Sequence, residues 1–213
     1  MAGALEKTVM SKWYSPAWAG FLGAWMVIAA PAAAQTADPA GSTVETLHNG
    51  LLSIMRAGAA AGQAGRARQI GPVIDRTFDM PQMTRLAVGP QWTGLAPADQ
   101  SALVAALRAL TVAQYARNFD SFSGERFTMV PQVETRGTDK LVRTTLVVPK
   151  GSAESLVYRL RQSSGGQWKI IDVYYRNSIS QLATRRADFA RVLAAGGARA
   201  LIAHLNELAA RPR

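Results

Sequence analysis

The sequence predicts an α+β fold: N-terminal helices, a four-stranded antiparallel meander sheet, and C-terminal helices that pack on it around an apolar cavity. The hydrophobic period indicates this order, since it is helical to about residue 120, alternating over residues 127–176, and helical again afterwards. Short segments rich in Gly, Ser and Pro separate the alternating runs, which is typical of a meander. Of the 213 residues, 48% are apolar and 18% charged, which excludes a disordered chain and allows one sizeable core.

The first 34 residues show the three parts of a secretory signal peptide. Lys7 and Lys12 form the basic part, and the apolar run Ala17–Ala30 is short for a bilayer span. An Ala-x-Ala site follows, so we expect cleavage after Ala34 and a single domain over residues 35–213.

An uncleaved anchor helix is the alternative to cleavage, and Met10 competes with Met1 as the true start. The chain has no Cys, which excludes a lipobox anchor, a disulfide framework and a thiolate site. Together with the signal pattern, the sequence predicts an exported protein of the periplasm.

Apolar residues at helical spacing predict four helices before the sheet. Gly62–Gly65 separates the first two, and Gly71-Pro72 interrupts or kinks the second. The fourth has an apolar face wider than one neighbour needs, which suits a cavity wall and a filled core equally. The expected ranges are Thr43–Ala61, Arg66–Thr77, a segment within Phe78–Trp92, and Pro97 to about Asp120.

Turn residues divide the next stretch into four predicted strands. Pro131 in the first indicates an edge position or a bulge, because proline donates no ladder hydrogen bond. The third alternates cleanly, with Leu156, Tyr158 and Leu160 on one face and arginines on the other. The expected strands are Phe127–Glu134, Leu141–Val148, Ser155–Gln162 and Gln167–Arg176. The closing helices are Ser178–Ala194 and Ala198–Ala209, separated by Gly196-Gly197.

Phe78–Trp92 is a compact helical segment with a clear end. Pro81 suits a first helical turn, and Gly89 can take a left-handed cap before Pro90. Periodicity alone predicts a short core helix. The segment also resembles the Phe-Asp-x-x-x-Met-x-Arg-x-x-x-Gly-x-x-Trp signature of the MlaC, or toluene-tolerance (Ttg2-type), family of periplasmic phospholipid-binding proteins. The residues that match in order are Phe78, Asp79, Met83, Arg85, Gly89 and Trp92.

The resemblance covers most of the chain after the signal. Ser123-Gly124-Glu125, the run Gly166–Val173 with its Gly-x-Trp-Lys-x-x-Asp-Val pattern, and Ile179–Gly197 follow in the family's order. One segment departs from it: the common pattern has Asn-Tyr-Arg after the last strand, where this chain has Ala183–Arg186. That segment is more similar to the hopanoid-associated HpnM branch. The resemblance therefore implies either a diacyl phospholipid or a hopanoid or other polar lipid as ligand.

Candidate catalytic groups are few. His48 and His204 are the only histidines, and no nucleophile elbow, phosphate-binding loop or His-Glu-x-x-His motif is present. We therefore expect no enzyme, no cofactor and no metal site. Asp79 and Asp172 are the carboxylates that invite a catalytic interpretation, but a structural ion pair of one of them with Arg85 is favoured, because a buried carboxylate needs a partner.

The net charge of +10 favours anionic partners. No basic run is longer than Arg185-Arg186, which favours lipid headgroups or a membrane surface over nucleic acid. With the resemblance, this predicts a soluble periplasmic carrier that shields acyl chains in an apolar cavity. The resemblance also implies a shuttle between an inner-membrane lipid transporter complex and an outer-membrane lipoprotein/porin complex.

The candidate cavity wall combines the signature segment, the long helix, the sheet and the closing helices. Its predicted residues are Met83, Leu86, Trp92, Tyr115, Phe119, Leu146, Leu156, Tyr158, Leu160, Val173, Ile179 and Phe189. The alternative to a lipid carrier is a nuclear-transport-factor-2-like domain that binds a small molecule or acts as an adaptor or enzyme. The sheet and helices alone are compatible with both.

Overall fold

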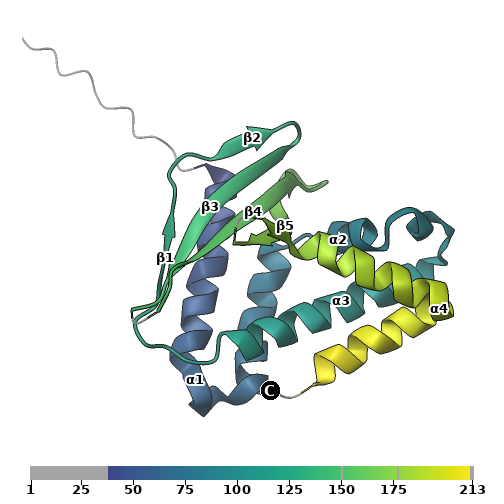
Figure 1. The fold of residues 1–213 in the computed structure, drawn as a ribbon, viewed down its shortest axis with the longest axis horizontal. Coiled ribbons are helices and arrows are strands. Elements are labelled where there is room, and N and C mark those ends of the chain that lie inside the picture. Colours follow the sequence, from purple (N-terminus) through teal and green to yellow (C-terminus); the bar gives the residue numbers. More distant parts are fainter. Residues whose placement is uncertain (1–37, 150, 177, 212–213) are drawn as a thin grey trace, which may run out of the picture. The chain divides into compact units, whose positions relative to one another are not determined.

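The order of helices and strands agrees with the predicted α+β class: helices, then an antiparallel sheet, then helix again (Figure 1). The structure, a computed structural model, describes residues 38–149, 151–176 and 178–211, all within one unit, Thr36–Arg213. The expected signal peptide, its cleavage after Ala34 and the choice of start lie outside these residues. Among the described helices, none combines the length and the apolar character needed to cross a bilayer.

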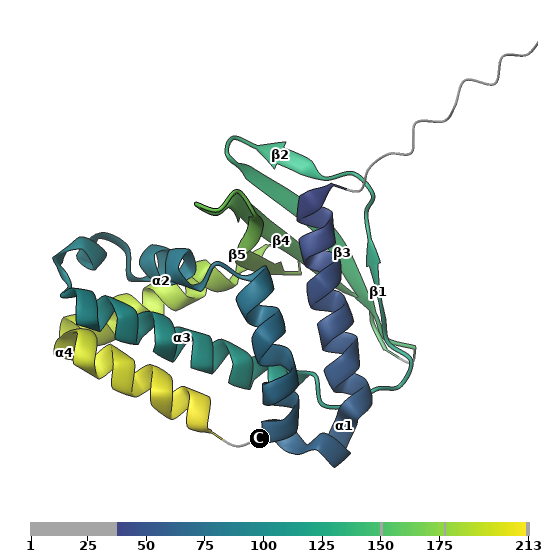
Figure 2. The same cartoon turned by 180° about the vertical axis from the view of Figure 1, so that it is seen from behind.

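Two of the helices fold back on themselves at glycines. The first leaves helical backbone angles at Gly58 and Gly62, so two arms lie side by side (Figures 1 and 2). The last turns in the same way at Gly196-Gly197, as predicted. The interruption predicted at Pro72 is wrong, because this exposed proline keeps helical angles within the second arm. The helical elements are α1 (Pro39–Thr77), α2 (Met80–Val88), the 3₁₀ helix η1 (Gly89–Gly94), α3 (Pro97–Asn118) and α4 (Gln181–Ala210).

The sheet is an antiparallel meander, but it has six strands rather than the four predicted. Pro131 lies between two short strands, so the expected first strand is split, and both halves pair with the same neighbour. A two-residue strand after the fifth adds the last edge. The strands are β1 (Arg126–Met129), β2 (Glu134–Arg136), β3 (Asp139–Val147), β4 (Glu154–Gln162), β5 (Trp168–Tyr175) and β6 (Ile179–Ser180), in the order β1-β3-β4-β5-β6 with β2 beside β3.

The N-terminal helices join the sheet through contacts between distant parts of the sequence. The Thr43 hydroxyl in α1 donates to the Trp168 carbonyl at 2.8 Å, and the Lys140 ammonium in β3 donates to Asp38 at 2.6 Å. The backbone N–H of Asp79, which caps α2, donates to the Ile170 carbonyl at 2.9 Å. These contacts hold α1 and α2 against β3 and β5. The hydrophobic core forms between them, with Leu47, Leu51, Ile74, Leu107, Leu160, Ile170 and Phe189 among its most buried members.

Candidate functional site

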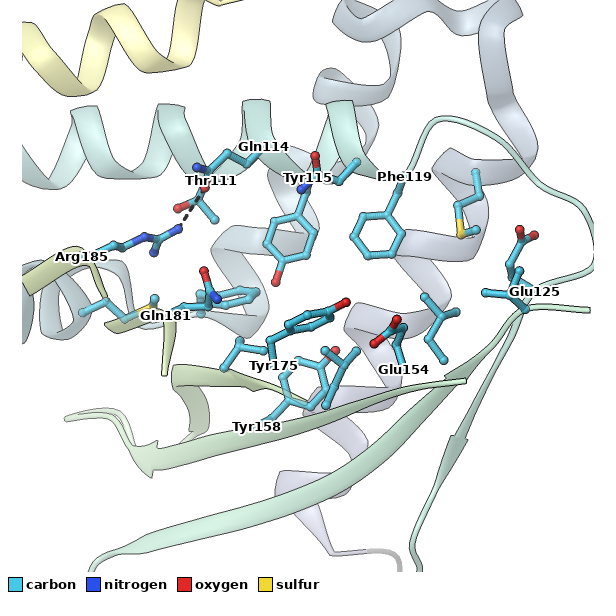
Figure 3. Close-up of a pocket in the computed structure, with 18 of the residues that line it drawn as sticks. Thr111, Gln114, Tyr115, Phe119, Glu125, Glu154, Tyr158, Tyr175, Gln181 and Arg185 are labelled. Atoms are coloured by element: carbon cyan, nitrogen blue, oxygen red, sulfur yellow. Dashed lines mark hydrogen bonds between the residues drawn. The ribbon is translucent and has the colours of Figure 1, made fainter. Parts of the chain in front are cut away.

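A cavity of about 540 Å³ lies between α3, the sheet and the start of α4 (Figure 3). The strand period explains the sheet wall, because Leu156 and Tyr158 are two residues apart on β4 and therefore face the same side. The helical period explains the opposite wall in the same way, since Thr111, Tyr115 and Asn118 recur on one face of α3. The apolar and aromatic lining consists of Met55, Phe78, Met83, Tyr115, Phe119, Leu146, Val148, Leu156, Tyr158, Val173 and Tyr175.

Aromatic side chains fill the middle of the cavity wall. The rings of Tyr115 and Phe119 stack at 5.7 Å, and Phe78 meets Tyr115 edge-on at 5.9 Å. Burial raises the pKa of Tyr115 to about 12, against the opposing effect of the nearby Arg185 charge. Burial also raises the pKa of Tyr158 well above its ordinary value. Both hydroxyls therefore stay protonated at neutral pH and act as neutral hydrogen-bonding groups.

The two ends of the cavity carry opposite charges. At one end the Arg185 guanidinium donates to Gln114 Oε1 at 3.1 Å, and Gln181 lies beside them (Figure 3). Desolvation lowers the pKa of Arg185, while electrostatic interactions with Tyr115 and Asp172 oppose this effect. Glu125 lies at the opposite end.

A second carboxylate of the lining, Glu154, is neutralised locally. Its oxygens accept hydrogen bonds from the Arg176 guanidinium at 3.2 and 3.3 Å. The Arg176 hydrogen bond, with one from Tyr175, holds the pKa of this carboxyl below its ordinary range. In the part of the chain that the structure describes, no group of three His, Cys, Asp or Glu residues is placed to hold a metal ion.

Comparison with known proteins decides the family. The family model described as MlaC protein matches residues 45–207, which is most of the chain. The chain belongs to the MlaC family. A solved structure of a phospholipid-binding protein from Ralstonia solanacearum, in complex with a phospholipid, has a similar fold, with a TM-score of 0.67 at 24% sequence identity. The likeness covers 80% of this chain and 97% of that one. The comparison with curated proteins gives no match.

Seven of the predicted wall residues line the cavity of this MlaC family member, and five do not. Leu160 and Phe189 are fully buried in the core, while Leu86 and Trp92 pack against it from outside. Ile179 is half exposed on β6. Apolar character and spacing are the same for a core residue and a cavity residue, so the sequence alone does not separate the two groups. The seven in the lining are Met83, Tyr115, Phe119, Leu146, Leu156, Tyr158 and Val173.

The polar lining was missed by the sequence prediction. Thr111 and Gln114 precede Tyr115 on the broad face of α3, and a polar residue on an apolar face is the signal that predicts such a lining. Gln181 and Arg185 are one helical turn apart at the start of α4 and face the same side. They belong to the segment where this chain departs from the common pattern.

The predicted ion pair of Arg85 with Asp79 or Asp172 is not formed between these described residues, since both carboxylates have other partners. Asp79 caps α2 by accepting from the Gln82 N–H at 3.0 Å. Asp172 is buried and accepts from the Ser180 hydroxyl at 2.6 Å and from two backbone N–H groups. Arg85 is exposed. Local hydrogen bonds thus satisfy the carboxylates without a distant cation.

A buried histidine behind the cavity predicts acid sensitivity. His48 stacks on Phe127 at 3.9 Å, and its Nε2 lies 3.2 Å from the hydroxyl of Tyr158, a wall residue. Burial lowers the pKa of His48 from 6.5 to about 4. The unfolded chain therefore binds the proton first, so stability is full above pH 6.5 and falls as the pH drops towards 4. The free energy of unfolding should fall by about 2 kcal/mol between pH 6.5 and 4.5 from this residue alone.

Urea denaturation across this pH range tests the expectation. His48→Gln should reduce the slope of stability against pH by that amount, because it removes the titrating group and keeps a polar side chain. His204→Gln is the matched control, since His204 is half-buried beside Asp188 and is not one of the residues that line the cavity. Equal slopes in wild type and His48→Gln would contradict the assignment.

Proposed function

We propose that the protein is a soluble periplasmic carrier that shields the acyl chains of a phospholipid or hopanoid-type lipid in its cavity. The observation that carries the proposal is the cavity: about 540 Å³, with apolar and aromatic walls and polar side chains at its ends. Small-molecule sites usually have this size and lining. The similar fold of a phospholipid-binding protein solved with a phospholipid supports the same class of ligand.

A carrier needs such a cavity because acyl chains are costly to expose to water. Each acyl methylene in water costs about 0.8 kcal/mol, so moving a two-chain lipid bare costs on the order of 20 kcal/mol. An apolar cavity replaces the membrane by protein interior and removes most of this barrier. Extraction of the lipid then exchanges the apolar interior of the membrane for the apolar cavity, so its free-energy change is small. Delivery of the lipid therefore needs a partner that opens the cavity or an acceptor that binds the lipid more tightly.

The sequence supports a periplasmic location for this carrier. We propose that residues 1–34 are removed on export and that residues 35–213 act in the periplasm, because the N-terminus has the three parts of a signal peptide. Membership of the MlaC family supports a shuttle between an inner-membrane lipid transporter complex and an outer-membrane lipoprotein/porin complex.

We infer binding and transport rather than catalysis. The cavity's tyrosine hydroxyls stay protonated at neutral pH, and its carboxylate Glu154 is paired with Arg176. The His48 imidazole lies behind the wall and interacts with Tyr158 rather than with the cavity space. These groups suit a binding site with fixed protonation states.

Native mass spectrometry of the protein purified from periplasm tests the proposal. We expect lipid at close to one molecule per chain, and extraction followed by lipid analysis identifies it. Phospholipid names the cargo directly, and a hopanoid keeps the carrier mechanism with a different cargo. Protein that is empty and also fails to take lipid from phosphatidylethanolamine–phosphatidylglycerol vesicles would exclude the carrier function.

A further inference from the structure

We propose that Arg185 makes the cavity selective for lipids with an anionic head, and that this anion is held inside the cavity between Arg185, Gln114 and Gln181. The inference rests on the proposed carrier function and adds the class of lipid that the site accepts. The shared chemistry is an acyl chain joined to a phosphate diester or a carboxylate. A neutral lipid with the same chains is bound less tightly.

Arg185 is a half-buried cation without an ion-pair partner among the described residues. Its one hydrogen bond goes to the neutral amide oxygen of Gln114. The nearby Asp172 carboxylate already accepts hydrogen bonds from the Ser180 hydroxyl and from backbone N–H groups, and it forms no ion pair with Arg185. A partly desolvated guanidinium that donates only to a neutral amide is less favourable for the empty protein than one paired with a carboxylate. A ligand anion would supply the negatively charged partner that the described residues do not give to Arg185.

The guanidinium has hydrogen-bonding capacity to spare. It carries five N–H donors in a planar fork that matches phosphate and carboxylate oxygens. No buried side-chain nitrogen lacks a partner within the described ranges, so the nitrogens of Arg185 that do not bond Gln114 are accessible. In Figure 3 the side chain reaches along the cavity end towards Gln114, with Gln181 below it. The two amides add neutral hydrogen-bond donors for the same oxygens.

The charge distribution fixes where the anion binds. Arg185 is the one cationic residue among the lining residues described, and Glu125 at the opposite end repels an anion from that end. The other lining carboxylate, Glu154, is paired with Arg176. Tyr115 and Phe119 lie between Arg185 and Glu125, so the apolar chain fits along the aromatic wall (Figure 3). The cavity is therefore polarised, and the anion has one favourable end.

The test compares lipids that share one labelled acyl chain and differ in their heads. Phosphatidylglycerol, diacylglycerol and a free fatty acid are each presented from cyclodextrin to the protein purified from periplasm. Wild type is expected to bind phosphatidylglycerol about ten-fold more tightly than diacylglycerol, or more. Equal binding of the fatty acid shows that any anion suffices, and preference for phosphatidylglycerol alone identifies the phosphate diester.

Variants of Arg185 and Arg186 distinguish the effect of the cation in the cavity from the effect of a changed net charge. Arg185→Gln should remove the ten-fold preference for phosphatidylglycerol and leave diacylglycerol binding unchanged. Arg186→Gln loses the same charge from the next residue, which is exposed and lies over Gly89 outside the cavity, and should behave as wild type. Arg185→Lys keeps the charge but not the fork, so it should retain part of the preference.

Stability separates ligand binding from a structural role. The melting temperature of lipid-free Arg185→Gln should equal or exceed that of wild type, because the variant removes a half-buried cation that has no ion-pair partner among the described residues. A large decrease would indicate a structural arginine and overturn the proposal. Equal effects of the Arg185 and Arg186 variants, or no head preference in wild type, would also overturn it while the carrier function stands. Failure to bind any of the three lipids, by protein that also carries no lipid when purified from periplasm, would exclude the carrier function itself.

Discussion

Replacing Leu156 by Trp is expected to weaken lipid binding strongly while the protein stays folded. Leu156 is half-buried on β4 and its side chain lines the cavity, so the larger ring extends into empty space rather than into packed core. If the indole displaces about four acyl methylenes at about 0.8 kcal/mol each, affinity falls by about 200-fold. Lipid transfer from vesicles to the purified protein measures the loss.

The neighbouring residue on the same strand provides the control. Ser155 faces the opposite side of the sheet from Leu156, so Ser155→Trp places the same ring away from the cavity. We expect near wild-type transfer for Ser155→Trp and similar melting temperatures for both variants. Normal transfer by Leu156→Trp would mean that the acyl chains bind elsewhere.

Replacing Asp172 by Asn is expected to lower the free energy of unfolding by about 3 to 4 kcal/mol. The buried carboxylate accepts from the Ser180 hydroxyl at 2.6 Å, the Leu182 N–H at 2.9 Å and the Val173 N–H at 2.8 Å. An amide has one acceptor oxygen, and its NH₂ group faces donors that need an acceptor. These bonds join β5 to the start of α4, so the loss is shared by both elements. Urea denaturation at pH 7 gives the value.

Two controls distinguish this account from the ion pair predicted from sequence. Asp79→Asn should change stability by less than about 0.5 kcal/mol, because Asn caps a helix as well as Asp does. Arg85→Gln should be similarly mild, since Arg85 is exposed. A loss of several kcal/mol in Arg85→Gln would restore the ion pair.

The local pattern of the sequence determines most of the fold. The change of period at the end of α3 and the glycines at 196–197 place the helices, and the turns place β3, β4 and β5 within about two residues. The break in α1 was expected at Gly62–Gly65 and occurs at Gly58 and Gly62. The strand number was wrong because β2 and β6 are too short to show a period. Each is defined by its pairing with a longer strand, which is a property of the folded sheet.

The cavity is harder to predict because it is the space that the packed side chains of the helices and the sheet do not fill. Leu156 and Leu160 lie on the same strand and belong to the same apolar pattern, yet one lines the cavity and the other is fully buried. Their difference arises only when the helices pack against different parts of the sheet. The partners of Asp172 show the same limit, since Ser180 and the backbone of Leu182 approach it only after β5 and α4 have packed.

The packing of α1 against β5 has a kinetic consequence. Thr43 and Trp168 are hydrogen-bonded although 125 residues separate them, so the first helix gains its sheet partner only after most of the chain is available. Contacts of such long range slow folding, because the entropy of closing the loop must be overcome first. A chain of this topology stays without a closed core until β5 has been made. Slow closure of this kind is compatible with export of the chain before it folds.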